Sequence, residues 1–273
     1  MFRECLDNVR EQAPLVHNIT NYVTVNDVAN ILLACGASPI MADDAAEAEE
    51  ITSLCKGLTI NIGTLNQRTI PSMLLAGKRS NQFGHPVLLD PVGVGASSFR
   101  TETARRLLRE VHFSAIRGNI SEIKTLLQGF GSTRGVDADL ADAVTNENKE
   151  ETIASLKAFS RETGSILAVT GAMDLVCDSA ACYVIHNGRA EMGRITGTGC
   201  QLSGMMTAFL AANPHNSLEA AAAAVCAMGL AGEIGWRNML PGDGNATYRN
   251  RVIDAIYHMT GEILQAGAVY EIY

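Results

Sequence analysis

The chain has 273 residues, of which 47% are hydrophobic and 18% are charged, a balance that allows a large buried core. Its formal net charge is −8 and it has no basic cluster, so we expect neither nucleic acid nor an acidic membrane surface as a partner. No run of about 20 residues lacks a polar interruption, which predicts no membrane span. The first residues do not resemble a signal peptide.

Seven cysteines lie scattered in mostly apolar contexts. An odd number without regular spacing favours a reducing cytoplasm over a disulfide framework. Cys177 and Cys182 have no neighbouring sulfur or histidine of the kind that a zinc site requires. We therefore expect both to be buried strand residues, and the protein to be cytoplasmic.

Hydrophobic periodicity predicts an alternation of helices and strands. In chain order we predict helix 21–35, strand 38–41, helix 43–51, strand 57–63, helix 66–81, strand 85–90, helix 100–110, strand 114–118, helix 121–128, loop 129–145, helix 148–163, strands 165–170, 173–178 and 181–186 with the last two as a hairpin, and helices 201–212, 217–236 and 245–265. Such alternation is typical of a mostly parallel sheet covered on both faces. We expect residues 1–273 to form one three-layer α/β/α domain.

A glycine-rich turn leads into the helix predicted over 201–212. It runs through Thr196, Gly197 and Gly199 to Cys200. Glycine lets a backbone approach a ligand closely, and the first turn of a helix presents unpaired amides and a positive dipole end. The pattern predicts an anion site, most naturally for phosphate, although a purely structural turn produces the same pattern.

Polar residues also end three predicted strands: Asp90, then Arg117 followed by Asn119 and Glu122, then Thr170. Ligands of such sheets bind at the carboxyl ends of the strands. These residues and the glycine turn would therefore surround one crevice, with carboxylates for Mg²⁺ and a guanidinium for phosphate, which suits phosphoryl transfer. Plainer interpretations remain open: an aspartate before proline caps a turn, and Asn119 with Glu122 forms a helix capping box.

Six motifs in chain order resemble those of the hydroxyethylthiazole kinases, thiamin-salvage enzymes of the ribokinase-like superfamily. They are residues 16–23 (VHNITNYV), 36–42 (GASPIMA), 61–65 (NIGTL), 89–96 (LDPVGVGA), 117–119 (RGN) with Glu122, and 196–200 (TGTGC). The motifs span essentially the whole chain. Their most specific combination is the cysteine that ends the glycine turn with the His-Asn-Ile-Thr-Asn sequence near the start.

The resemblance implies a ribokinase-like fold and a reaction in which ATP phosphorylates the hydroxyl of 5-(2-hydroxyethyl)-4-methylthiazole. It implies that ATP binds at Arg117, Thr170, Thr196 and Gly199, that Mg²⁺ binds at Asp90 and Glu122, that the thiazole alcohol binds at Met41, Gly197, Asn21 and Val23, and that Cys200 lies at the reacting hydroxyl. It further implies a homotrimer with each site at a subunit boundary.

Cys200 stands where related sugar and pyrimidine kinases carry an aspartate base. A thiol has an ordinary pKa of about 8.5, and a helix N-terminus lowers it. We expect Cys200 to orient the alcohol and to accept its proton late. A covalent phosphocysteine and a small buried cysteine without a chemical role are the alternatives.

Two other functions remain open. An ADP/ATP-dependent NAD(P)H-hydrate dehydratase, a lyase, shares the implied fold; we expect it to carry an aspartate in place of Cys200 and to lack the His-Asn-Ile-Thr-Asn sequence. A binding protein without catalysis would have no need of Asp90, Arg117, Glu122 and Cys200 together. His17 is expected to be a structural histidine or to position a loop.

Overall fold

In the computed structural model, which describes residues 1–128 and 143–273, nine strands form one sheet in the order β2-β1-β3-β4-β5-β6-β7-β8-β9. Their bounds are β1 Leu15–Ile19, β2 Ser38–Met41, β3 Gly57–Asn61, β4 Val87–Asp90, β5 Ala115–Asn119, β6 Ile166–Thr170, β7 Asp174–Cys177, β8 Cys182–Ile185 and β9 Tyr270–Ile272. The strands from β2 to β6 pair in parallel, and β7, β8 and β9 continue the sheet antiparallel. The predicted mostly parallel sheet and the predicted hairpin are confirmed.

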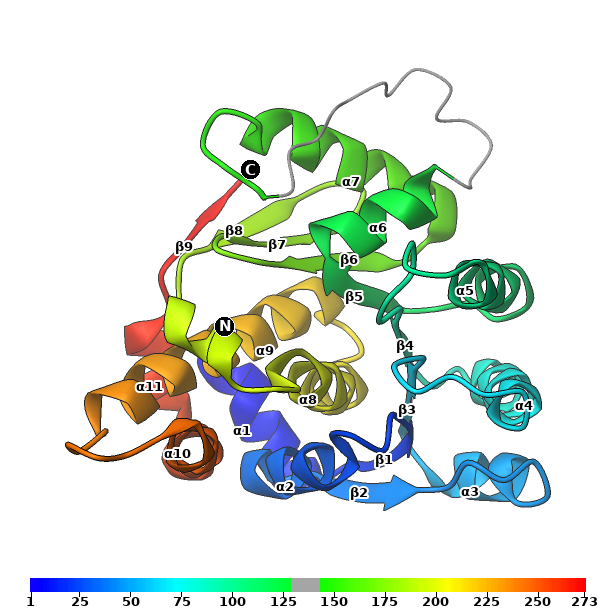
Figure 1. Ribbon diagram of the computed structural model, residues 1–273, viewed down its shortest axis with the longest axis horizontal. Coiled ribbons are helices and arrows are strands. Elements are labelled where there is room, and N and C mark those ends of the chain that lie inside the picture. Colours follow the sequence, from blue (N-terminus) through cyan, green and yellow to red (C-terminus); the bar gives the residue numbers. More distant parts are fainter. Residues whose placement is uncertain (129–142) are drawn as a thin grey trace.

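Helices cover both faces of this sheet (Figure 1). One face carries α3 (Ala48–Leu54), α4 (Thr69–Gln82), α5 (Ser98–Glu110), α6 (Ile120–Leu127) and α7 (Lys149–Thr163). The other carries α1 (Phe2–Gln12), α2 (Val25–Cys35), α8 (Thr198–Ala212), α9 (Ser217–Arg237), α10 (Asn245–His258) and α11 (Gly261–Gly267). A short 3-10 helix, η1 (Ala190–Arg194), precedes α8.

The alternation of side chains along each strand explains the three layers. In β4, Val87 and Leu89 belong to the core beneath α3–α7, whereas Leu88 belongs to the core beneath α8 and α9. A strand that is apolar at every position is buried on both faces, and this is why residues 85–90 predict a central strand. The three-layer α/β/α architecture is therefore confirmed.

Several predicted boundaries are wrong. The helix α1 and the strands β1 and β9 were not predicted; in β1 the buried polar residues His17 and Asn18 interrupt the apolar pattern. The helix predicted over 245–265 divides, because Met259 is extended and Thr260 caps α11 by accepting from the amide of Ile263 at 3.2 Å. Residues 129–142 of the predicted loop 129–145 lie outside the described residues.

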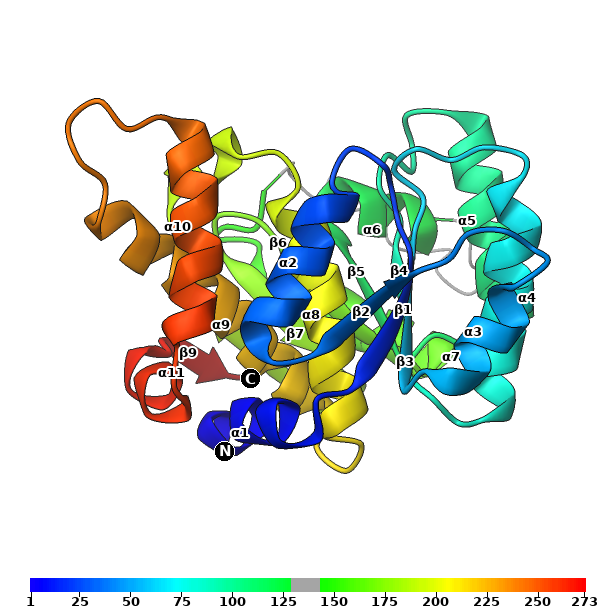
Figure 2. The ribbon, with the colours of Figure 1, turned by 90° about the horizontal axis from the view of Figure 1, so that it is seen from below.

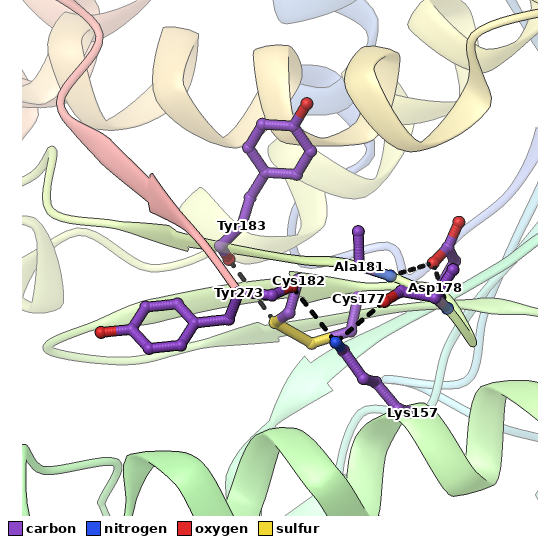
Figure 3. The surroundings of a disulfide bond; sticks show 8 residues. Lys157, Cys177, Asp178, Ala181, Cys182, Tyr183 and Tyr273 are labelled. Atoms are coloured by element: carbon purple, nitrogen blue, oxygen red, sulfur yellow. Dashed lines mark hydrogen bonds between the residues drawn. A yellow bond between two sulfur atoms is a disulfide. The ribbon is translucent and has the colours of Figure 1, made fainter.

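The bond between Cys177 and Cys182 was not predicted. They lie opposite each other in the β7–β8 ladder, with Cα atoms 4.0 Å apart, and form a disulfide (Figure 3). The hairpin register brings them together, which a count of cysteines does not reveal. Both are fully buried, as predicted. The free cysteines are Cys5, Cys35, Cys55, Cys200 and Cys226.

The helix α9 is long and apolar enough to cross a membrane, but 83% of its most apolar window is buried inside the protein. It packs against α8 and α10 and contacts the sheet. Its alanine-rich stretch, Ala220 to Ala224, is fully buried, which fits close packing between helices. The helix α9 therefore serves as a core helix of this fold.

The position of α8 in the core gives a stability prediction. Phe209 of α8 is fully buried, so we expect Phe209→Ala to lower the free energy of unfolding by about 3–5 kcal/mol, measured by urea denaturation. Phe83 is 46% exposed, and Phe83→Ala is the matched control, with an expected loss of about 1 kcal/mol or less. Equal losses in the two variants would contradict the placement of Phe209 in the core.

Candidate active site

The carboxyl ends of the central strands meet at one edge of the sheet. Asn61 ends β3 opposite Asp90 at the end of β4, and Asn119 ends β5 opposite Thr170 at the end of β6. The helix α8 contacts β1, β3 and β4 and packs between α2 and α9 (Figure 2). The predicted gathering of strand-end residues is therefore present, and α8 begins beside it.

Asp90 is fully buried at the centre of this group. Its Oδ2 accepts hydrogen bonds from Asn61 Nδ2 at 2.7 Å and from Ser203 Oγ at 2.8 Å, and lies 3.5 Å from Arg117 Nη1. Burial raises the pKa of Asp90 above its usual range, and Arg117 and the two hydrogen bonds offset only part of this effect. Its Oδ1 is buried without a hydrogen-bond partner, so one carboxylate oxygen remains available to a further ligand.

Arg117 joins Asp90 to Thr170 and to the start of α8. Its Nη2 donates to Thr170 Oγ1 at 2.7 Å. A Cβ on Gly199 would lie 2.3 Å from the guanidinium, so the absence of a side chain there allows the contact. The first helical amide bond of α8 runs from Gln201 to the carbonyl of Gly197. The amides of residues 198–200 therefore have no helical partner and can receive an anion beside Arg117.

Two asparagines hold the sulfur of Cys200. Asn61 Nδ2 approaches the sulfur at 3.3 Å and Asn21 Nδ2 at 3.2 Å. Asn61 Oδ1 accepts from Asn21 Nδ2 at 3.1 Å and from the Gly63 amide at 2.8 Å, and Asn21 Oδ1 accepts from the Thr24 amide and hydroxyl. Both side-chain amides use all their hydrogen-bonding positions, and this fixes their orientation. Asn61 thereby joins Cys200 to Asp90.

The expectation of a lowered thiol pKa is wrong. Burial, and next the charge of Asp90, raise the pKa of Cys200, and hydrogen bonds from Thr24, Asn21 and Asn61 offset only part of this effect. Desolvation disfavours the charged form of any group, and it is the largest effect on this thiol. The thiol therefore remains protonated at neutral pH and accepts two N–H hydrogen bonds.

Two cavities lie on either side of this network. The smaller, about 180 Å³, has a mixed apolar and polar lining that includes Met41, Tyr22, Val25, Asn61, Thr64 and Met73. The larger, about 620 Å³, has a lining that includes Arg117, Thr170, Asp174, Arg189, Thr198 and Gly199. Asn61 lines the first cavity and Arg117 the second, and Asp90 contacts both side chains. The arrangement provides a small pocket and a cationic pocket joined through one carboxylate.

Within the described part of the chain, the remaining predicted site residues make no hydrogen bond to the side chains of Asp90, Arg117 or Cys200. Gly197 precedes α8 with a φ of 83°, and a Cβ there would lie 2.3 Å from Thr24 Cγ2. Glu122 forms the capping box with Asn119 and also accepts from the Gly93 amide at 2.8 Å. Thr196 is exposed. Val23 is 61% exposed and is absent from the linings of both cavities.

Sequence interpretation gave no role to Asn61, Ser203, Thr24 or Asp174. Asn61 lies near the end of the strand predicted over 57–63, and Ser203 follows Gly199 by one helical turn; these positions were the available signals. His17 is fully buried, with Nε2 2.7 Å from the Ala42 carbonyl and Nδ1 2.9 Å from Thr52 Oγ1. The structure therefore favours the structural interpretation of His17, as a residue that holds the segment after β2.

The raised thiol pKa gives a labelling prediction. Cys200 is partly exposed whereas the other free cysteines are buried, so iodoacetamide should modify Cys200 first. A higher pKa leaves less thiolate at a given pH, so the labelling rate should reach its midpoint above the value of a free thiol, measured by peptide mass spectrometry across pH. Cys200→Ser should remove the fast label. A midpoint below that of the free thiol would contradict the assignment.

Comparisons with known proteins agree on one family. The family model described as "Hydroxyethylthiazole kinase family" matches residues 6–262. The chain is 56% identical to "Hydroxyethylthiazole kinase" of Clostridium acetobutylicum over the full length of both chains, and 46% identical to that of Desulfovibrio desulfuricans, covering 98% of this chain and 97% of the relative.

The solved structures agree. A hydroxyethylthiazole kinase protein from Pyrococcus horikoshii superposes with a TM-score of 0.87 at 34% identity, covering 100% of this chain and 98% of that one. A ribokinase-like superfamily protein from Enterococcus faecalis, 13% identical with a TM-score of 0.65 and covering 96% and 89% of the chains, shares the fold alone. This chain therefore has a ribokinase-like fold and belongs to the hydroxyethylthiazole kinase family.

Proposed function

We propose that the protein transfers the terminal phosphoryl group of ATP to the hydroxyl of 5-(2-hydroxyethyl)-4-methylthiazole, giving the thiazole phosphate for thiamin synthesis. The observation that carries the proposal is the continuous contact from Cys200 through Asn61 and Asp90 to Arg117, which joins the two cavities. The family match supports the choice of alcohol and nucleotide.

The larger cavity is proposed for the nucleotide. Arg117 and the unpaired amides at the start of α8 offer charge and N–H donors to phosphate oxygens, and Thr170 adds a hydroxyl to the same wall. Gly199 keeps the backbone close to Arg117. Thr196 begins the glycine turn and is also proposed to contact the nucleotide.

Mg²⁺ is proposed to accompany the nucleotide. The free, buried Oδ1 of Asp90 fits a metal ligand, and Mg²⁺ in such enzymes uses one or two carboxylates with substrate phosphates. No group of three or more acidic, histidine or cysteine side chains in residues 1–128 and 143–273 is arranged to hold a metal by itself, which fits a metal completed by phosphate. Bound Mg²⁺ would neutralise phosphate charge. Glu122 is proposed to contact the metal through a water molecule.

The smaller cavity is proposed for the thiazole ring, with Met41 in its lining. Asn21, Gly197 and Val23 are proposed to complete this pocket when the alcohol binds, although none of the three is in the lining. The hydroxyl would lie against the sulfur of Cys200. As the new O–P bond forms and the bond to ADP breaks, the sulfur of Cys200 takes the hydroxyl proton while the thiol gives its own proton to solvent, so the residue is a neutral thiol before and after the transfer. A loose transition state needs little early deprotonation, so a neutral thiol is sufficient if it orients the alcohol and relays the proton late by releasing its own.

We propose a homotrimer of single-domain chains in the cytoplasm. One sheet contains all nine strands of the described residues, and the family match covers residues 6–262, which supports one domain. Tyr22, which lines the small cavity, and its chain neighbour Val23 are 75% and 61% exposed, which supports a neighbouring subunit that completes the site. ATP supply favours the cytoplasm, and the Cys177–Cys182 disulfide is the feature that opposes it.

The function is tested by coupled ADP release. We expect ADP to form with the thiazole alcohol, to depend on Mg²⁺, and to stay at background with hydroxymethylpyrimidine. Hydrated NADH with ADP or ATP tests the lyase. Background ADP release with the thiazole alcohol at saturating ATP would contradict the kinase proposal, and dehydration of hydrated NADH would replace it.

Variants of Cys200 test its role. We expect Cys200→Ala to lower kcat by about 10²-fold or more, the range of a lost general base, and Cys200→Asp to retain or raise activity. Steady-state kinetics with both substrates varied provides the measurement. Turnover of Cys200→Ser close to wild type would contradict proton acceptance, and a folded but inactive Cys200→Asp would count against it too.

A further inference from the structure

Asp174 is an acidic residue in the cationic cavity that the proposed chemistry does not use. It begins β7 and lines the larger cavity together with Arg117 and Thr170. A carboxylate beside a bound polyphosphate is unfavourable by charge alone. An interaction with another group must therefore account for an acidic residue at this position.

That interaction is a single hydrogen bond across the β6–β7 turn. Asp174 Oδ1 accepts from the Gly171 amide at 2.8 Å. The turn that this bond closes runs from Thr170 to Asp174 and follows directly on the strand end that carries Thr170. Thr170 in turn accepts from Arg117 Nη2 at 2.7 Å. The contacts thus run from Asp174 through the turn to the guanidinium.

The turn separates the larger cavity from a third cavity of about 500 Å³. Three residues of the turn line both of these cavities: Thr170, Gly171 and Ala172. Gly171 and Ala172 are exposed, so few packing contacts hold them in place. The hydrogen bond to Asp174 is the polar contact that fixes the Gly171 amide among the described residues.

The surroundings of Asp174 agree with an anchoring role. Burial raises the pKa of Asp174 to about 7, and Arg117 of β5 lowers it. On the other side, the charge of Asp174 helps to raise the pKa of Cys226 in α9. The half-buried carboxyl group thus lies where an acceptor oxygen is useful and a full charge is costly.

We propose that Asp174 is a positioning residue for the nucleotide: by accepting from the Gly171 amide it fixes the turn that places Thr170 against Arg117. This inference rests on the proposed function for the identity of the nucleotide. The role requires an acceptor oxygen and does not require a negative charge. The substitution Asp174→Asn keeps the acceptor and removes the charge, whereas Asp174→Ala removes both, so the pair of variants separates the two properties.

The test is calorimetric binding of a non-hydrolysable ATP analogue with Mg²⁺, together with KM for ATP and kcat. We expect Asp174→Ala to weaken nucleotide binding on the order of tenfold and to raise KM for ATP with a much smaller change in kcat and in KM for the alcohol. Asp174→Asn should bind the nucleotide within about threefold of wild type, because it keeps the acceptor. Should Asp174→Ala fail to fold, Asp174→Leu keeps the side-chain volume without the acceptor.

Asp178 provides the matched control at the other end of β7. Its Oδ1 accepts from the amides of Ala180 and Ala181 at 2.7 Å each (Figure 3), so Asp178→Ala removes a similar turn contact away from the cavity and should leave nucleotide binding unchanged. Wild-type affinity in Asp174→Ala, or equal weakening in Asp174→Asn and Asp174→Ala, would overturn the inference. Wild-type protein that binds nucleotide but releases no ADP with the thiazole alcohol would instead contradict the proposed function.

Discussion

The buried carboxylate of Asp90 is the constraint on which the rest of the crevice depends. A charge removed from water is tolerated only when it is paired and hydrogen-bonded. Asp90 meets this requirement with Asn61 of β3, Arg117 of β5 and Ser203 of α8. Three separate elements must therefore dock in register before the charge is stabilised. The same contacts place the proposed alcohol and nucleotide pockets on either side of one residue.

The charge of Asp90 also explains why a thiol suits the position of Cys200. A second carboxylate there would face Asp90 through the side chain of Asn61, and like charges at such a site disfavour ionisation. A thiol stays neutral when buried, and Cys200 does so under the combined effect of burial and Asp90. The two asparagines that donate to its sulfur hold it in place. The residue is thus better suited to orientation than to strong basicity.

The local pattern of the chain predicts the parts of the fold that depend on continuous apolar segments. The strand over 85–90 and the helix over 217–236 were predicted nearly to their bounds, because both are buried along most of their length. The strand β1 was missed because its buried polar residues, His17 and Asn18, interrupt the apolar pattern, and His17 is satisfied only by distant contacts. The Cys177–Cys182 bond was missed for a related reason, since it depends on hairpin register.

Some residues of the candidate site could likewise be predicted from the sequence, and others could not. Asp90, Arg117 and Thr170 were predictable because each lies at or near the end of a strand of a parallel sheet, and such ends converge. Asn61, Ser203 and Asp174 were not identified, because an amide, a hydroxyl and a turn carboxylate are common in sequence and gain a role only through the partners that the fold supplies. The direction of the pKa shift of Cys200 was also wrong, because burial is the largest effect on the thiol and the sequence does not show how deeply the residue is buried.

The central claim is that one carboxylate separates an alcohol pocket from a nucleotide pocket. The most direct measurement is a crystal structure with the thiazole alcohol, Mg²⁺ and a non-hydrolysable ATP analogue. The account predicts the terminal phosphate between Arg117 and the first amides of α8, with the substrate hydroxyl against the sulfur of Cys200. A nucleotide bound away from Arg117, or a hydroxyl directed away from Cys200, would contradict it.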